Sequence, residues 1–230
     1  LVLNSSNLKK MLRFGLPFLP ASIFFIIIEL SDRWMIQWLR GLEEVGLYGS
    51  GYKIGSLILM LVLGFNLNWQ PYYLKNNTGD SEEKLRVISN FFIMFLILST
   101  WIVSVFAPAF LSSDLSQMIF FRWFVNSEFY IIGKEFWAGF SVIPAVCFGY
   151  IFYGIFITQM PSVYLRDKQN WIPVFWGLGV AINIVFNYVF INMYGFSGAA
   201  VSTMTTYLFM ASFISYKNRV WMNLSLNYKI

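Results

Sequence analysis

The chain has 230 residues, of which 58% are hydrophobic, 20% are aromatic and only 12% are charged, with a net charge of +5. The mean hydropathy is +0.62, and the charged share is about half that of a typical soluble domain. A soluble core cannot bury this much apolar surface, so the composition predicts an integral membrane protein. The chain holds no histidine and one cysteine, Cys147, which excludes an internal disulfide, Cys/His metal sites and histidine-dependent triads.

Apolar runs predict six membrane-spanning helices and therefore an all-α fold class, a polytopic membrane protein. Pro108 is expected to end the third span, and Pro144 to kink the fourth. Gly51 and Gly55 are four residues apart, a spacing that lets another helix approach closely. The connections are short, so residues 1–230 are expected to form one six-helix bundle. Its spans are expected at about 12–39, 52–73, 87–106, 136–160, 172–193 and 198–216.

Lysine and arginine positions predict the orientation of this bundle. If the N-terminus is cytoplasmic, the inner segments hold eleven of the sixteen basic residues, as the positive-inside rule expects. The segment from Leu111 to Phe136 mixes charges with apolar runs that are too short to cross, which predicts an interfacial helix. The chain begins at Leu1 without methionine and shows no signal peptide, which indicates a piece of a longer protein.

Charged residues interrupt the first predicted span. Glu29, Asp32 and Arg33 lie in its second half, and Ser22 and Gln37 fall on the same side of the helix, within an arc of roughly 140°. Glu29 and Arg33 form an i,i+4 pair in the favourable order. The sequence therefore predicts one polar stripe on an otherwise apolar helix.

This stripe has two interpretations. It can line a water-filled cavity, because charge at membrane depth usually marks a substrate or ion path. Alternatively, the hydrocarbon ends near Leu30 and the charges lie among headgroups beside Trp34 and Trp38. Only Glu29 lies deep enough for its protonation to couple transport, whereas Asp32 and Arg33 could form an interfacial pair.

Amides are the next candidates. Asn183 and Asn187 form an i,i+4 pair on the fifth span, where they either join helices by hydrogen bonds of roughly 0.5–2 kcal/mol or line a cavity. Asn66, Asn68 and Gln70 form either a polar end of the cavity or a cytoplasmic helix terminus. Most tyrosines and tryptophans are interpreted as membrane-interface residues rather than sugar platforms. The sequence shows no phosphate-binding loop and no paired carboxylates in an enzyme cleft, so no enzyme and no ATP-driven mechanism is predicted.

The order of motifs resembles a known family. FGLPFLPASIFFIIIELSDRWMI, GLEEVGLYGSGYKIGSLI, PAVCFGYIFYGIFIT, YLRDKQNW and NIVFNYVFINMYGFSGAAVSTMTTYLF follow one another over nearly the whole chain. They are similar to the polysaccharide transporter branch of the flippase superfamily that also contains multidrug extruders. The resemblance implies a transporter of 12–14 spans built from two similar halves, of which this chain looks like the carboxy-terminal one.

The same resemblance implies a function. A polyprenyl-diphosphate-linked oligosaccharide would move from the cytoplasmic to the outer leaflet of a bacterial inner membrane, for O-antigen lipopolysaccharide, capsule or exopolysaccharide synthesis. Both termini would be cytoplasmic. The partners would be the substrate, membrane lipids, the missing half and polysaccharide-assembly proteins, with no cofactor and no nucleic acid. Arg33 and Lys53 would attract the diphosphate or acidic sugars in a cationic cavity. Glu29 and Asp32 would hold Arg33 in place or respond to a coupling ion or proton.

Three other functions are weighed against this one. A multidrug or small-cation extruder of the same superfamily would carry more acidic than basic residues in its cavity. A membrane-embedded polysaccharide polymerase or glycosyltransferase would need a large outer loop rich in acids or arginines. A non-transporting remnant would follow from the absence of the other half.

Overall fold

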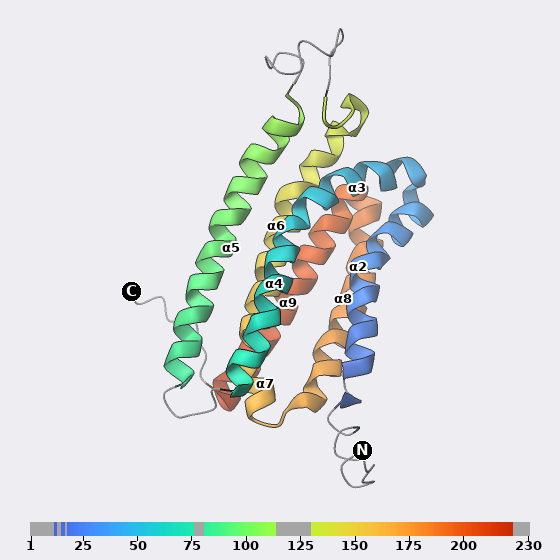
Figure 1. Cartoon of the computed structure of the whole chain (residues 1–230). Coiled ribbons are helices and arrows are strands. Elements are labelled where there is room, and N and C mark those ends of the chain that lie inside the picture. Colours follow the sequence, from blue (N-terminus) through green and yellow to red (C-terminus); the bar gives the residue numbers. More distant parts are fainter. Residues whose placement is uncertain (1–11, 13–14, 17, 76–80, 114–129, 223–230) are drawn as a thin grey trace, which may run out of the picture.

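A computed structural model describes residues 12, 15–16, 18–75, 81–113 and 130–222, and these described residues form helices and short connections without a strand. Figure 1 shows the long helices running along one common axis. In chain order the elements are α2 (Phe18–Arg40), α3 (Leu42–Gly55), α4 (Leu57–Lys75), α5 (Ser81–Leu111), the 3-10 helix η2 (Lys134–Val142), α6 (Ile143–Thr158), α7 (Pro161–Leu165), the 3-10 helix η3 (Gln169–Trp171), α8 (Ile172–Tyr194) and α9 (Phe196–Trp221).

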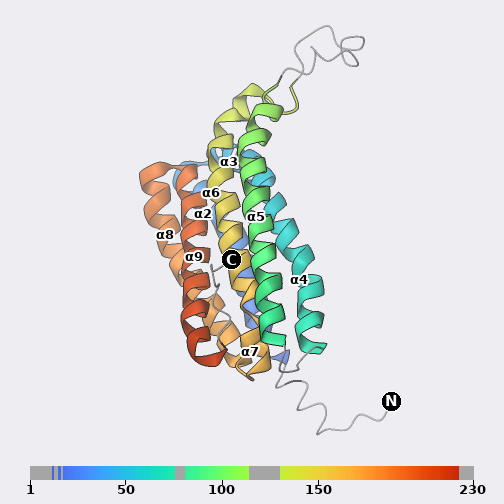
Figure 2. The ribbon, with the colours of Figure 1, turned by 90° about the vertical axis from the view of Figure 1, so that its left-hand side faces the viewer.

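The core lies around α6. Most of its side chains are buried, and it packs against α9 on one side and α5 and α4 on the other, as Figure 2 shows. A second tight layer joins α2 to α8 and α8 to α9. The outer faces are apolar as well, with Phe91, Trp101 and Val185 more than half exposed. Apolar residues on the outside are what a helix surrounded by lipid requires.

Three helical stretches within the described residues are long and apolar enough to cross a membrane, namely Glu82–Leu111, Lys134–Leu165 and Gln169–Tyr194. The pair of α3 and α4, bent by 44° at Ser56, makes a fourth. The predicted all-α polytopic class is thereby confirmed. The count of six spans stays a prediction, because α2 carries Glu29, Asp32 and Arg33 in its second half and α9 is rich in serine and threonine. Both of these polar helices contribute residues to the candidate site.

Several predicted helix bounds are wrong. Pro108 lies inside α5, which ends at Leu111. Pro144 occupies the first turn of α6, where its missing N–H is tolerated, and it follows a 3-10 helix instead of kinking an α-helix. The second helical unit begins at Leu42 and not near residue 52. The predicted interfacial helix falls mainly on residues 114–129, outside the described residues.

Glycines bring α3 against η2 and α6 at backbone distance, as the Gly51–Gly55 spacing predicts. A Cβ atom on Gly51 would collide with the carbonyl oxygen of Gly139, and one on Gly55 would lie 2.6 Å from Cγ1 of Val146. Gly139 in turn leaves no room for a Cβ beside the carbonyl oxygen of Leu47. This contact fixes the position of α3 along the bundle axis and its rotation about its own axis. It therefore also fixes the positions of two tyrosines of the candidate site that α3 carries.

The corner between α2 and α3 holds the turn between α8 and α9. The guanidinium of Arg40 donates to the carbonyl oxygens of Ile191, at 3.0 Å and 3.2 Å, and of Asn192, at 2.7 Å. The carboxylate of Glu44 accepts a 2.8 Å hydrogen bond from the backbone N–H of Phe196. A cation thus lies at the carboxyl end of α8 and an anion at the amino end of α9, as the two helix dipoles favour.

This corner gives a first testable prediction. Glu44→Ala leaves the first N–H group of α9, that of Phe196, without its acceptor, so we expect it to lower the free energy of unfolding by about 1 kcal/mol. Thermal unfolding in detergent measures the loss. Glu43→Ala is the matched control, because Glu43 is the exposed neighbour of the same charge. Equal stability losses in the two variants would contradict the capping role.

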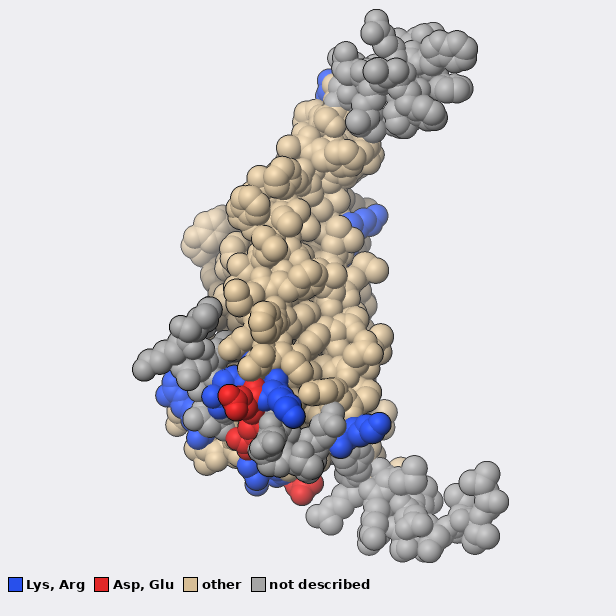
Figure 3. Space-filling model, turned by 60° about the vertical axis from the view of Figure 1, so that its left-hand side comes forward, with Lys and Arg blue, Asp and Glu red and all other residues tan. Residues whose placement is uncertain are grey.

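Charged side chains gather at one end of the molecule, where α4 ends, α5 begins and α7 and α9 end (Figure 3). Arg166 reaches Glu82 there, with Nη2 and Oε1 3.3 Å apart. The basic residues of this end include Lys75, Lys84 and Lys168, which the sequence assigns to the cytoplasmic side. The structure groups them as predicted, and their cytoplasmic location stays a prediction.

Candidate functional site

Glu29 lies midway along α2 and binds tyrosines from three other helices. Its Oε2 accepts hydrogen bonds from the hydroxyls of Tyr52 on α3, at 2.5 Å, and Tyr150 on α6, at 3.0 Å. Its Oε1 accepts one from Tyr207 on α9, at 2.6 Å. The hydroxyl oxygens of Tyr52 and Tyr150 are also 2.5 Å apart. The Glu29 carboxylate is therefore held by the hydroxyl groups of three tyrosines, each from a different helix.

Asp32 lies one helical turn further along α2 and is only 1% exposed. Its Oδ2 accepts hydrogen bonds from Tyr48 at 2.5 Å and from Thr203 at 2.8 Å, and its Oδ1 accepts one from Asn187 at 2.8 Å. These donors come from α3, α9 and α8. Asp32 therefore joins four helices, and each of its oxygens has a partner, as a buried carboxylate needs.

The two candidate amides extend this network between α2, α8 and α9. Asn187 donates to Oδ1 of Asn183 at 3.1 Å, and Ser31 donates to the same oxygen at 2.7 Å. Both asparagines are 0% exposed. The structure places them in the contact between helices, the arrangement expected of amides that join helices, and not on a groove.

Arg33 and Lys53 lie together on a groove. The groove has a volume of about 580 Å³ and is lined by Arg33, Val45, Gly46, Gly49, Ser50, Lys53, Ile54, Ile132 and Phe136. Arg33 donates to the backbone carbonyl of Glu29 at 3.2 Å, and its guanidinium carbon lies 4.5 Å from the ring centre of Tyr52. Within the described residues, neither cation forms an ion pair with a carboxylate. The groove therefore presents two positive charges that pair with no carboxylate in the described part of the chain.

Other predicted polar residues lie apart from this site. Asn66 is half-buried on α4 and forms no hydrogen bond with the network among the described residues. Ser22 and Gln37 are exposed, and Ser22 donates to the carbonyl of Phe18 within its own helix.

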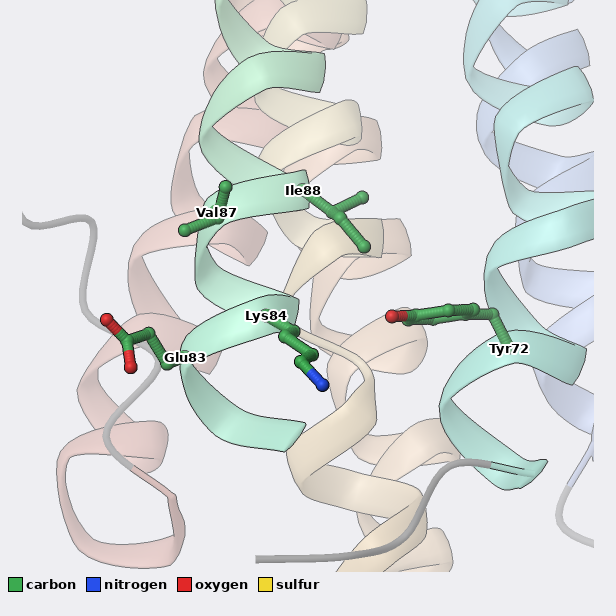
Figure 4. Close-up of a pocket in the computed structure, with 5 residues that line it drawn as sticks. All are labelled: Tyr72, Glu83, Lys84, Val87 and Ile88. Atoms are coloured by element: carbon green, nitrogen blue, oxygen red, sulfur yellow. The ribbon is translucent and has the colours of Figure 1, made fainter. Parts of the chain in front are cut away.

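A second groove, of about 550 Å³, opens between α4 and α5 at the charged end, where Lys84 points toward Tyr72 and Glu83 points away (Figure 4). It contains none of the predicted site residues.

The tyrosines were not predicted from the sequence as partners of the two carboxylates. Tyr48 and Tyr52 face α2, where Asp32 and Glu29 lie. The sequence does contain a signal for one of these contacts. Asp32 and Tyr48 are each eight residues from Arg40, so a helical hairpin that turns at Arg40 brings the two together. Tyr150 and Tyr207 carry no such signal.

Comparison with known proteins gives two matches. Residues 2–76 match a family model described as "Polysaccharide biosynthesis protein". This stretch includes α2, α3 and α4. A solved structure of a transporter of the multidrug/oligosaccharidyl-lipid/polysaccharide (MOP) superfamily from Pyrococcus furiosus is similar, with a TM-score of 0.65 and 18% identity. No curated protein matches the chain by sequence.

The similarity to the archaeal structure covers 92% of this chain and 45% of that one, so the chain spans about half the length of its structural neighbour. The archaeal transporter is described as having a binding pocket of reverse polarity, which suggests a different function for that protein. The likeness shows a shared fold. The family match covers the amino-terminal third of this multi-pass membrane protein, and the structural likeness extends over most of its length.

Proposed function

We propose that this chain is one half of a flippase that moves a polyprenyl-diphosphate-linked oligosaccharide from the cytoplasmic to the outer leaflet of a bacterial inner membrane. The observation that carries the proposal is the groove in which Arg33 and Lys53 lie without a carboxylate partner among the described residues. A diphosphate offers several acidic oxygens, and a guanidinium fork beside an ammonium group is well suited to bind them.

Support also comes from the surroundings of this groove. Its remaining lining is largely small or apolar, with Gly46 and Gly49 exposing backbone and Ile132 and Phe136 forming an apolar wall. Such a surface accommodates an isoprenoid chain beside its charged headgroup. The half-length match to a larger transporter supports a second half as partner, which would face this one across the substrate path.

A transport assay tests the proposal. The chain is produced with its full reading frame in a strain in which surface polysaccharide depends on it, and Arg33→Gln and Lys53→Gln are compared with Lys168→Gln. We expect polysaccharide export to fall about tenfold or more in each groove variant, because each loses a charge-assisted contact with the diphosphate. Lys168 is exposed at the opposite, charged end and serves as the matched control. Wild-type export by both groove variants would refute the assignment.

Extrusion of cationic drugs is the second candidate function, because Glu29 places a carboxylate midway along α2. The same strains distinguish it. Export of a cationic dye that is lost in Glu29→Gln and kept in Arg33→Gln would favour an extruder. Loss of polysaccharide without any change in dye accumulation would favour the flippase.

A further inference from the structure

Tyr52 contacts the half-buried carboxylate of Glu29 and the groove cation Arg33 with two different parts of one side chain. Its hydroxyl donates to Oε2 of Glu29 at 2.5 Å, while the face of its ring lies under the guanidinium of Arg33, 4.5 Å from the guanidinium carbon. Glu29 and Arg33 occupy successive turns of α2, yet the carboxylate of Glu29 binds tyrosines and not the guanidinium. Tyr52 is the side chain that touches the charged groups of both.

The surroundings leave Tyr52 little freedom. It is 6% exposed, its ring packs against that of Tyr48 at 5.3 Å between centres, and its hydroxyl also meets that of Tyr150. The preceding residue, Gly51, lies against the backbone of Gly139, which fixes the helix that carries the ring. A change in the hydrogen bond to Glu29 is therefore transmitted to the ring and not absorbed by loose packing.

Arg33 depends on this ring. Among the described residues its guanidinium has two partners, the carbonyl oxygen of Glu29 at 3.2 Å and the ring of Tyr52. The carbonyl oxygen belongs to the backbone of α2 and stays in place when side chains change. The ring of Tyr52 is thus the side-chain support of the Arg33 guanidinium, and a small shift of the ring changes how far Arg33 extends over the groove.

We propose that Tyr52 is a positioning residue that couples Glu29 to Arg33, so that the charge state of the Glu29 carboxylate sets the anion affinity of the groove. This coupling rests on the proposed diphosphate site. When Glu29 is ionised, it accepts a strong hydrogen bond from the phenol, the ring stays under the guanidinium and Arg33 is presented to the anion. When Glu29 is neutral, this hydrogen bond weakens, the ring shifts and the groove loses affinity for the diphosphate.

Two neighbouring tyrosines make a matched comparison possible. Tyr52→Phe keeps the ring but removes the hydroxyl that binds Glu29. Tyr207→Phe removes a hydroxyl from the other Glu29 oxygen, and no contact of Tyr207 with Arg33 or with the Tyr52 hydroxyl is found in the described part of the chain. Tyr52→Leu removes the ring as well. Near-equal elution profiles and helical content of the purified variants establish that each is folded.

The first experiment needs no substrate. Phenylglyoxal modifies exposed guanidinium groups, and peptide mass spectrometry gives the rate at Arg33 in the purified protein. We expect Tyr52→Leu and Glu29→Gln each to raise this rate about threefold to tenfold, and Tyr207→Phe to leave it unchanged. Glu29→Gln added to Tyr52→Phe should bring no further increase. Equal rates in the wild type and Tyr52→Leu would overturn the proposal.

The second experiment measures binding of farnesyl diphosphate, with farnesol as the uncharged reference. We expect Glu29→Gln to weaken diphosphate binding several-fold in the wild-type and Tyr207→Phe backgrounds and to have no effect in the Tyr52→Phe background. The same several-fold loss in both tyrosine backgrounds would overturn the coupling. If the wild type binds farnesyl diphosphate no better than farnesol, the proposed function fails, and the modification rates of Arg33 still decide the coupling.

Discussion

Gly51→Ala is expected to lower the free energy of unfolding by about 3 kcal/mol, the upper end of the range for an overpacked contact. The added methyl group would collide with the carbonyl oxygen of Gly139, a backbone atom that no rotamer change can move. Relief requires α3 to move away from η2, and Tyr48 and Tyr52 lie on α3. The variant should therefore lose anion binding along with stability.

Gly49→Ala is the matched control, because it lies two residues away in the same helix and no other atom lies within 4 Å of the added Cβ. Alanine favours a helix over glycine, so this variant should gain about 0.5–1 kcal/mol. Thermal unfolding in the same detergent compares the two. Similar midpoints for both variants would show that α3 and η2 are not in close contact.

The helices could be predicted from sequence because the length of an apolar run is a local property. The residues at which these helices begin and end were harder to predict. The stretch from Gly41 to Gly51 looks like a loop, since it contains four glycines and two acids, yet it belongs largely to α3. Glu43 and Glu44 in the first turn favour a helix start, which the glycine content obscures. Pro108 was a misleading stop signal, because a helix can pass a proline at the cost of one hydrogen bond to the preceding turn, and α5 continues to Leu111.

The candidate site could be predicted in part. Periodicity places Glu29 and Asp32 on one side of α2, and the structure gathers donors from other helices around both. Tyr150 and Tyr207 were not predictable as partners, because thirteen tyrosines suit a membrane interface as well as a buried network. The meeting of Arg33 and Lys53 on one groove follows from the hairpin of α2 and α3, and the first half of α3 was not expected to be a helix.

Asp32→Leu is expected to lower the free energy of unfolding by about 3–5 kcal/mol. The substitution removes the acceptor of three buried donors, the hydroxyls of Tyr48 and Thr203 and the amide of Asn187. Leucine fills the volume but accepts no hydrogen bond, and each donor left without a partner costs about 1–3 kcal/mol. Unfolding of the purified protein in detergent, followed by helical content, measures the loss.

Tyr48→Phe distinguishes the contribution of the hydrogen bonds around Asp32 from that of side-chain packing. It removes one donor and leaves two on the carboxylate, so we expect a loss of about 1 kcal/mol. When Tyr48→Phe is combined with Asp32→Leu, the further loss of stability should be small. In the Asp32→Leu background the Tyr48 hydroxyl has already lost its acceptor, so its removal breaks no further hydrogen bond. Glu83→Ala, which removes an exposed acid at the charged end, should stay within about 0.5 kcal/mol of the wild type. If Asp32→Leu is as mild as Glu83→Ala, Asp32 does not hold the four helices together, and the buried network is not what fixes α2 beside the groove.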